Sequence, residues 1–274
     1  MSMPSMDDIA LVELHRAAAL ADRPGIAIIS RDAPRVDAKT HSRKKTHGAI
    51  SRLRRSGRVH QVRRDLIVLP DAAGVVRTTL AELIAAIAPR PYLITGGAAL
   101  EAHGLTDQHF FDTVVLVFTP IEQITWRGET TRFLLTSPDR IWSQPTGAAA
   151  VAAEPLVAGA ERALLDALHH SRYGVSLGQA VAALQTAIDR DAAFPRKLFA
   201  ATRRYGSAST ARRAGFLVEL LAGEAAAEPF QRLIGRRPGP TALRPHAPQD
   251  GEINKRWRLR VNTEAVRPGL IRGR

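Results

Sequence analysis

A helical pattern followed directly by two short apolar segments is the feature that most constrains how this chain folds. Residues 42–58 read SRKKTHGAISRLRRSGR, and their apolar side recurs at helical spacing, at Thr46, Ala49, Ile50 and Leu53. The next residues read VHQVRRDLIVLP, which are two apolar segments around a polar turn. We therefore expect a helix that buries one face, followed by a basic β-hairpin.

The opposite face of this helix is cationic. Residues 42–58 hold seven Lys or Arg and no acid, whereas a solvated helix face normally mixes the two signs, because like charges three or four residues apart repel. Residues 31–64 hold twelve Lys or Arg against two Asp, a balance of +10 within a net charge of +13. The pattern predicts that negative charge from outside the chain, such as nucleic-acid phosphate, neutralises this segment. The alternative is a basic surface that is merely solvated.

The residues before the basic helix have the features of two further helices. Asp7–Ala21 carries an apolar stripe with acids in its first turn, Ile26–Ile29 is a short apolar run, and Ser30 is placed to cap a brief helix that Pro34 disturbs. Three helices followed by a basic hairpin is the order of a winged helix-turn-helix. We predict such a DNA-binding domain over residues 1–72.

In a domain of this kind one helix presents donors to the major groove, and the hairpin, or wing, reaches phosphates or the minor groove. We therefore expect a set of polar side chains from the basic helix and the hairpin turn to contact DNA. This set is Arg43, Lys44, Lys45, His47, Ser51, Arg52, Arg55, Arg63 and Arg64.

Beyond a linker near residues 71–74, we expect residues 76–274 to form a mixed α+β domain with a helical end, so the fold class of the whole chain is α+β. The expected elements are a helix capped by Thr78 or Thr79, strands at Val114–Phe118 and Thr130–Leu135, and helices from Ala160 onward, with Ser176 as a further helix cap.

The last part of the chain changes character twice. The Pro- and Gly-rich stretch 236–251 is typical of a linker. In NKRWRLRVN, apolar residues alternate with arginines, a period that predicts a strand with one apolar and one cationic face. The cationic face would consist of Arg256, Arg258 and Arg260.

Composition excludes several classes of protein. The chain has no Cys, so disulfides, thiolate metal sites and a Cys nucleophile are excluded, which fits a cytoplasmic location. The most apolar stretch, near residues 146–168, is interrupted by Glu154, Pro155 and Glu161 and is too short for a membrane span. Neither His169–His170 nor His41–His47, which lie six residues apart, has the spacing of a helical metal site. We expect no membrane contact, no metal and no cofactor.

The alternative to a DNA-binding protein is an enzyme. The stretch LITGGAALEAHGLTDQHFFDTVVLVF is similar to the opening of a nucleotidyltransferase, in which a Gly-rich turn holds triphosphate and two alternating carboxylates bind Mg²⁺. Gly96 and Gly97 are present, but Asp112 has no second carboxylate two residues away. A tight packing turn explains the glycines more simply. We therefore predict that the protein is not an enzyme.

The chain resembles the AbiEi-type antitoxins of abortive-infection (type IV) toxin–antitoxin systems. The resemblance rests on LRRSGRVHQVRRDLIVLP, YLITGGAALEAHGL, ERALLDAL and RWRLRVN, in this order across about residues 5–265. It implies a transcriptional autorepressor whose winged helix binds inverted repeats in its own promoter. It also implies an antitoxin that counteracts a nucleotidyltransferase-like toxin, without the need for a stable complex. Non-specific binding of nucleic acid remains an alternative.

Overall fold

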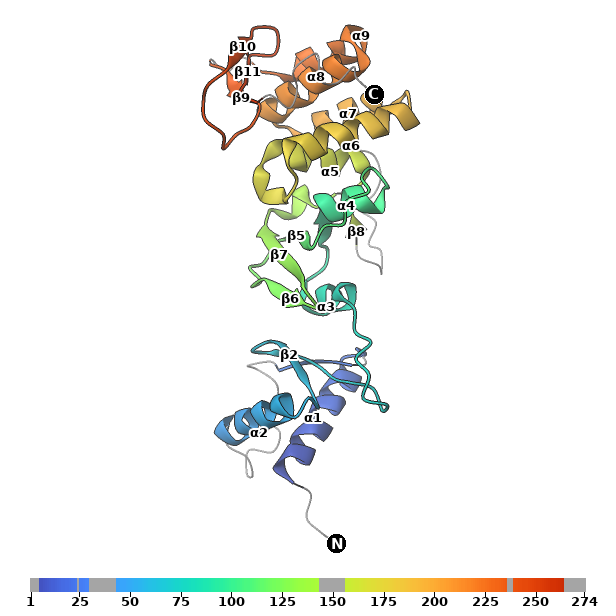
Figure 1. Ribbon diagram of the computed structural model, residues 1–274, viewed down its shortest axis with the longest axis vertical. Coiled ribbons are helices and arrows are strands. Elements are labelled where there is room, and N and C mark those ends of the chain that lie inside the picture. The colour runs from blue at the N-terminus through green and yellow to red at the C-terminus, as the bar shows by residue number, and fades with distance from the viewer. Residues whose placement is uncertain (1–4, 24, 30–42, 143–155, 236–238, 264–274) are drawn as a thin grey trace. The chain divides into compact units, whose positions relative to one another are not determined.

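The computed structural model describes residues 5–23, 25–29, 43–142, 156–235 and 239–263. Contacts divide the chain into two compact units. Unit 1 comprises Met1–Ala88 and Ile124–Glu129, and unit 2 comprises Pro89–Gln123 and Thr130–Arg274. Throughout the described residues the chain mixes helices with small sheets (Figure 1), which confirms the α+β fold class.

Unit 1 contains a small antiparallel sheet in which β3 lies in the middle. Its elements are α1 (Met6–Leu20), β1 (Ile26–Ile28), α2 (Arg43–Arg55), β2 (His60–Arg63), β3 (Leu66–Val68), α3 (Leu80–Ile87) and β6 (Ile124–Trp126). The strand order is β1-β3-β2, with Val68 opposite both Ile26 and His60. The expected hairpin is therefore confirmed. The brief helix expected after Ser30 lies outside the described residues.

The core of unit 1 forms where α1, α2 and the sheet meet. Three of the positions expected on the inner face of α2 are buried, namely Ala49, Ile50 and Leu53. The side chain of the fourth, Thr46, lies outside the described residues. The three buried residues belong to one cluster with Leu14 of α1 and Ile67 of β3. The helical spacing in the sequence thus predicts which side of α2 is buried.

The domain boundary expected between residues 72 and 76 falls inside unit 1, which extends through α3. Two hydrogen bonds to backbone carbonyls hold this segment. The Trp126 indole donates to the Thr78 carbonyl at 2.9 Å, and the Arg23 guanidinium donates to the Ala86 carbonyl. Both bonds join segments far apart in the sequence, so a local pattern does not reveal that α3 packs with unit 1.

The largest sheet has the strand order β6-β7-β5-β4-β8. Its further strands are β4 (Leu93–Thr95), β5 (Asp112–Val117), β7 (Glu129–Leu135) and β8 (Leu156–Val157). β5 runs antiparallel to β4 and parallel to β7, and β4 runs parallel to β8. The strands expected at Val114–Phe118 and Thr130–Leu135 are confirmed.

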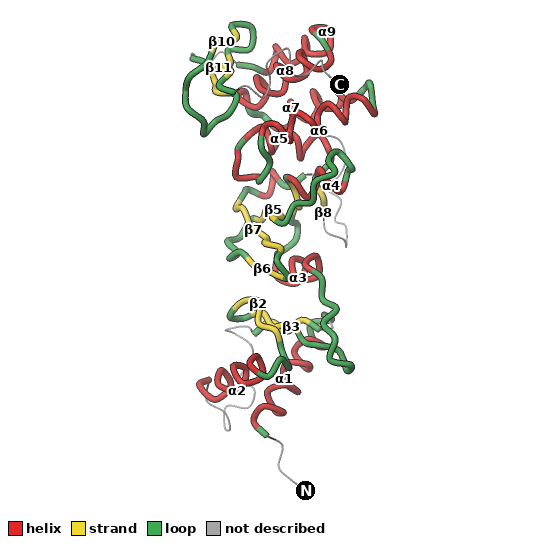
Figure 2. The backbone as a smooth tube through the Cα atoms, in the orientation of Figure 1, coloured by secondary structure: helices red, strands yellow, loops and turns green. Residues whose placement is uncertain are grey.

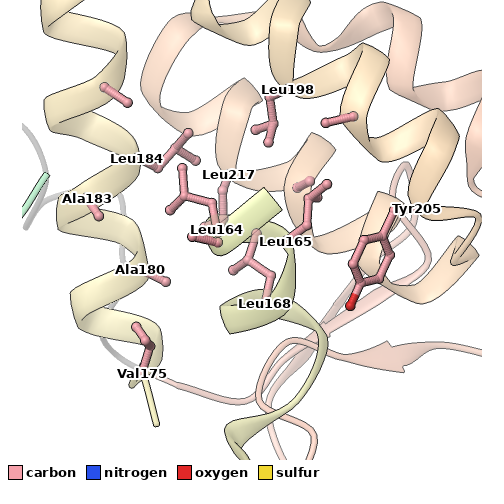
Figure 3. Packing of buried hydrophobic residues seen from close by; sticks show 14 of the residues in the cluster. Leu164, Leu165, Leu168, Val175, Ala180, Ala183, Leu184, Leu198, Tyr205 and Leu217 are labelled. Atoms are coloured by element: carbon pink, nitrogen blue, oxygen red, sulfur yellow. The ribbon is translucent and has the colours of Figure 1, made fainter. Parts of the chain in front are cut away.

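Helices are the main regular structure of unit 2 (Figure 2). They are α4 (Gly97–Ala102), η1 (Pro138–Arg140), α5 (Ala160–His169), η2 (Ser171–Tyr173), α6 (Leu177–Arg190), α7 (Phe194–Tyr205), α8 (Ala208–Ala222), α9 (Glu224–Ala227) and η3 (Glu228–Leu233). α5 is central: Leu164 and Leu165 pack among Leu184 of α6, Leu198 of α7 and Leu217 of α8 (Figure 3). The expected helical region is confirmed.

The end of the chain differs from the expected linker and strand. A small sheet contains β9 (Thr241–Ala242), β10 (Glu252–Asn254) and β11 (Leu259–Val261) in the order β10-β11-β9. Leu243, within the expected linker, is buried. The expected strand NKRWRLRVN is a hairpin instead, because residues 255–258 form a turn in which Arg258 has a φ of 49°. The Trp257 N–H stabilises this turn by donating to Asn254 Oδ1 at 3.0 Å.

A buried carboxylate joins the sheet and the helices of unit 2. Asp166 Oδ2 accepts hydrogen bonds from Thr95 Oγ1 at 2.7 Å and from Arg162 Nε at 2.9 Å, and Oδ1 accepts one from the Tyr205 hydroxyl at 2.9 Å. Arg162 also donates to the Arg140 carbonyl at 2.7 Å. Burial, followed by the charge of Asp166, raises the pKa of Tyr205, so its hydroxyl remains a donor.

Gly215 on α8 lies so close to Trp257 that a side chain at this position would collide with the ring. A Cβ on Gly215 would lie 2.1 Å from Trp257 Cζ3 and 2.9 Å from Phe230 Cβ, and both aromatic residues are buried. We expect Gly215→Ala to lower the free energy of unfolding by about 1–3 kcal/mol, because a packed core must shift to accept the methyl group. Urea denaturation measures this change.

Gly178→Ala on α6 is the matched control. Nothing lies within 4 Å of a Cβ at this position, and Ala favours a helix over Gly by about 1 kcal/mol. The control should therefore be at least as stable as the original protein. Unchanged stability of Gly215→Ala would contradict the close packing described above.

Candidate nucleic-acid interface

The candidate interface consists of α2 and the β2–β3 hairpin of unit 1. Because α2 buries its apolar face, its polar face is left to solvent. Ser51, Arg52 and Arg55, which the sequence predicts for the interface, lie on the polar side, where both arginines are exposed and Ser51 is half-buried. Arg54, which is not among the residues predicted to contact DNA, is exposed as well.

Two arginines of this region are bound by carboxylates of α1. Arg52 donates through Nε and Nη2 to Asp7, with a shortest distance of 2.7 Å, and Arg58 donates through Nη2 to Asp8 at 3.0 Å. The acids lie 45 and 50 residues earlier in the chain. The expectation that negative charge for this segment comes entirely from outside the chain is therefore wrong, because α1 supplies part of it.

Both ion pairs are open to solvent. The side chains of Arg52 and Arg58 are 49% and 44% exposed. The hydrogen bond to Asp7 raises the pKa of Arg52, and hydrogen bonds from Ser5 and then Arg58 lower the pKa of Asp8. Exposed pairs stabilise a fold little and are screened by salt. These guanidinium groups can therefore exchange a carboxylate for another anion.

The two arginines expected in the wing differ in exposure and in their hydrogen bonds. Arg63 is half-buried and donates through Nε and Nη2 to the two carboxylate oxygens of Asp65, at 2.7 and 3.1 Å. Arg64 is exposed at the turn, where its carbonyl accepts a hydrogen bond from Gln61 Nε2 at 3.3 Å. The strand register shifts between Gln61 and Arg63, an irregularity that bends a hairpin locally. Of the two, Arg64 is the more accessible.

The side chains of Arg43, Lys44, Lys45 and His47 lie outside the described part of the structure, although their backbone belongs to α2. The described interface brings together five exposed arginines, Arg52, Arg54, Arg55, Arg58 and Arg64. Arg54 and Arg58 are not among the residues predicted from the sequence to contact DNA. The signal for them was the count of cations in residues 42–58, which includes both.

Arg256, expected on a cationic face, is surrounded by acids instead. Its guanidinium pairs with Glu219 at 3.1 Å, with Glu228 at 2.9 Å and with Glu224. The hydrogen bond to Glu224 is the main cause that raises the pKa of Arg256. These acids neutralise the arginine within unit 2, so its assignment to a free cationic face is wrong.

The other two arginines of the expected cationic face are bound less tightly. Arg258 is exposed, and its Nη1 lies 3.5 Å from the Gly235 carbonyl. Arg260 is half-buried in β11, and its Nη1 donates to the Gly251 carbonyl at 3.3 Å. Because Arg256 and Arg258 lie in a turn and Arg260 in a strand, the strand alternation that would align all three is absent.

Close packing explains the glycine pair that is similar to a nucleotidyltransferase turn. Gly96 has a φ of 68°, and a Cβ there would lie 2.2 Å from the Tyr173 carbonyl oxygen. A Cβ on Gly97 would lie 2.1 Å from the Phe110 ring. Asp112 is exposed at the start of β5. The fold therefore requires both glycines whether or not a phosphate binds nearby.

Other side chains that could act as nucleophiles or metal ligands are hydrogen-bonded within the fold. Ser176, within GVSLG, caps α6 in a capping box with Gln179, as expected. His169 Nδ1 lies 2.9 Å from Thr210 Oγ1. Among the described residues, no group of three or more His, Asp or Glu is arranged to hold a metal ion. In the same parts of the chain, no helix is both long and apolar enough to cross a membrane.

Comparison with known proteins gives a similarity of fold. No protein-family model matches the chain, and no curated protein matches it. A solved structure described as "Crystal structure of RV2827C protein from Mycobacterium tuberculosis" is similar, with a TM-score of 0.54 and 14% sequence identity. The match covers 94% of this chain and 92% of that chain. At this identity the similarity shows a shared fold that spans both units, and fold alone does not define function.

Proposed function

We propose that unit 1 is a winged helix-turn-helix module that binds double-stranded DNA, and that the protein represses transcription from its own promoter. The chain order α1-β1-α2-β2-β3 and the sheet order β1-β3-β2 support this proposal. In it, α2 is the recognition helix that enters the major groove and the β2–β3 hairpin is the wing.

The observation that carries the proposal is the division of α2 into a buried apolar side and an exposed cationic side. Ala49 and Leu53 anchor the helix in the core of unit 1, while Arg54 and Arg55 remain exposed. An α-helix fits the major groove of B-DNA, where arginine is the commonest donor to guanine. Arg64 at the hairpin turn adds a cation for a phosphate or for the minor groove.

Binding to DNA would also change the ion pairs of α1. The phosphates compete with Asp7 for Arg52 and with Asp8 for Arg58, since both pairs are exposed. While DNA is absent, the carboxylates of Asp7 and Asp8 bind the two guanidinium groups that would otherwise bind phosphate. They therefore lower the affinity for all duplexes, and favourable base contacts are needed to overcome this competition.

We further propose that the protein is an antitoxin that counteracts a nucleotidyltransferase-like toxin. Support comes from the ordered resemblance to AbiEi-type antitoxins, whose quoted motifs occur in both units. Unit 2 has its own extensive core, so it can carry a role separate from DNA binding.

Charge reversal on the exposed side of α2 or on the wing should weaken DNA binding strongly. We expect Arg55→Glu and Arg64→Glu each to bind DNA much more weakly. The affinity is measured by fluorescence anisotropy with a labelled duplex from immediately upstream of this protein's own gene, with excess unrelated duplex as competitor. If roughly six phosphates are neutralised per protomer, the logarithm of the association constant should fall with the logarithm of salt concentration with a slope of about −5.

Arg196→Glu, an exposed position on α7 of unit 2, makes the same charge change outside the proposed interface and should leave DNA binding intact. Unchanged affinity in both Arg55→Glu and Arg64→Glu would refute the proposal that α2 and the β2–β3 hairpin contact DNA. Equal competition by any duplex or by RNA would instead favour a non-specific nucleic-acid-binding module.

Removing the acids of α1 should have the opposite effect. Asp7→Asn with Asp8→Asn frees Arg52 and Arg58 from carboxylates, so we expect several-fold tighter DNA binding at low salt, with a smaller gain at high salt because of screening. Asp250→Asn, an exposed acid of unit 2, is the control. Weaker binding of the double variant would show that Asp7 and Asp8 position the arginines rather than compete with DNA.

The antitoxin role can be separated from repression in cells. Expression of a nucleotidyltransferase-like gene encoded alongside should arrest growth, and co-expression of this protein from an unrelated promoter should restore it. Arg55→Glu should still restore growth, because the proposal places neutralisation outside α2. Failure of the original protein to restore growth would refute the antitoxin role without affecting the DNA-binding proposal.

A further inference from the structure

Unit 2 contains a cavity of about 530 Å³ at the junction of α7 and α8. Its lining includes residues 136–137 after β7, Arg140 of η1, Arg162 of α5 and residues 207–209 at the start of α8. All lining residues belong to unit 2. An inference about this cavity therefore does not depend on DNA binding by unit 1.

The lining of the cavity is cationic. It includes four arginines, Arg140, Arg162, Arg172 and Arg212, and hydroxyl groups of Ser, Thr and Tyr. No Asp or Glu occurs among the described residues that line it. Asp166, which lies behind the wall, compensates the charge of Arg162, so the exposed cations of the lining are Arg140 and Arg172. Uncompensated positive charge in a concave site raises the local concentration of anions. The cavity therefore favours an anion.

Two of these arginines are held in fixed positions by the fold. Arg162 is 2% exposed and bonded to Asp166, and Arg212 is 2% exposed and donates to the carbonyls of Ile234 and Gly239, both at 3.1 Å. Because these guanidinium groups are already ordered, an incoming anion loses little affinity to their ordering. Arg140 and Arg172 are exposed, and Arg140 Nη1 donates to the Tyr205 carbonyl at 3.1 Å.

The N-terminus of α8 lies at the same cavity, because Ser207, Ala208 and Ser209 belong to its lining. Ser207 caps the helix, and its Oγ accepts the N–H of Thr210 at 3.3 Å. The N–H groups of Ala208 and Ser209 lie in the first turn, where no acceptor exists within the helix. α8 is 15 residues long, so its dipole also favours negative charge at this end.

We propose that this cavity binds the phosphate group of a phosphorylated small molecule about the size of a nucleoside monophosphate. Guanidinium groups match the oxygens of phosphate in geometry and charge, and the α8 N–H groups supply further donors. The cavity volume lies in the range of sites for small organic ligands, about 300–1,000 Å³. A free phosphate ion fills only part of it, which leaves room for an attached group.

Titration calorimetry on the full-length protein tests the proposal with four probes: inorganic phosphate, a nucleoside monophosphate, a sugar phosphate and the nucleoside without phosphate. Both phosphomonoesters should bind, at least one of them more tightly than inorganic phosphate, and the nucleoside should not bind measurably. The comparison between nucleotide and sugar phosphate identifies which attached group the cavity prefers.

Two substitutions place an acid at the cavity. Arg172→Glu reverses an exposed cation, and Ser209→Glu puts a carboxylate in the first turn of α8, where it favours the helix and opposes a phosphate. Each should weaken binding of the preferred phosphomonoester by about tenfold or more, because a charged partner is replaced or repelled. Thermal melts without ligand should show that both variants remain folded.

Arg196→Glu is again the control, since it makes the same charge change as Arg172→Glu, on α7 away from the cavity lining. It should retain binding of the phosphomonoester. Absence of binding by both phosphomonoesters, or an equal loss in Arg196→Glu and in the two cavity variants, would overturn the proposal. Binding of inorganic phosphate with no gain from either attached group would refute the small-molecule assignment.

Discussion

The architecture of unit 2 depends on one buried carboxylate. Asp166 has no exposed surface, and donors from β4, α5 and α7 converge on its two oxygens. Removing one partner of a buried charge typically costs about 3–5 kcal/mol, because the other group is left unpaired. The strand and the two helices must therefore keep their mutual positions. Since Arg162 and Tyr205 also line the α7–α8 cavity, the same carboxylate fixes part of its wall.

Several arginines that raise the net charge of the chain are internal cross-links. Arg213 on α8 is buried and donates to the carbonyls of Leu168, His169 and Ala242. Its burial lowers its pKa to about 10. Arg256 is surrounded by three glutamates. The 39 Lys and Arg residues therefore overstate the number of cations that are available to a partner.

Local patterns predicted the elements better than the contacts between them. The hairpin and the helix caps at Thr79 and Ser176 could be predicted, because each depends on residues within a few positions. The exposed side of α2 followed from helical spacing. The Asp7–Arg52 pair and the glutamates around Arg256 could not be predicted, since they join residues brought together only by the fold. The cavity was missed for the same reason, as its lining extends from Thr136 to Thr241.

The two proposed anion sites differ in how their charge is held. On α2 the arginines are exposed, and two of this group of cations, Arg52 and Arg58, are bound by carboxylates, so the proposed binding of DNA there would depend steeply on salt. In the cavity, Arg162 and Arg212 are buried and fixed by hydrogen bonds, so dissolved ions screen them less. Ionic strength therefore acts mainly on unit 1. A phosphorylated ligand in unit 2 would remain bound under conditions that release DNA, which makes the two activities physically separable within one chain.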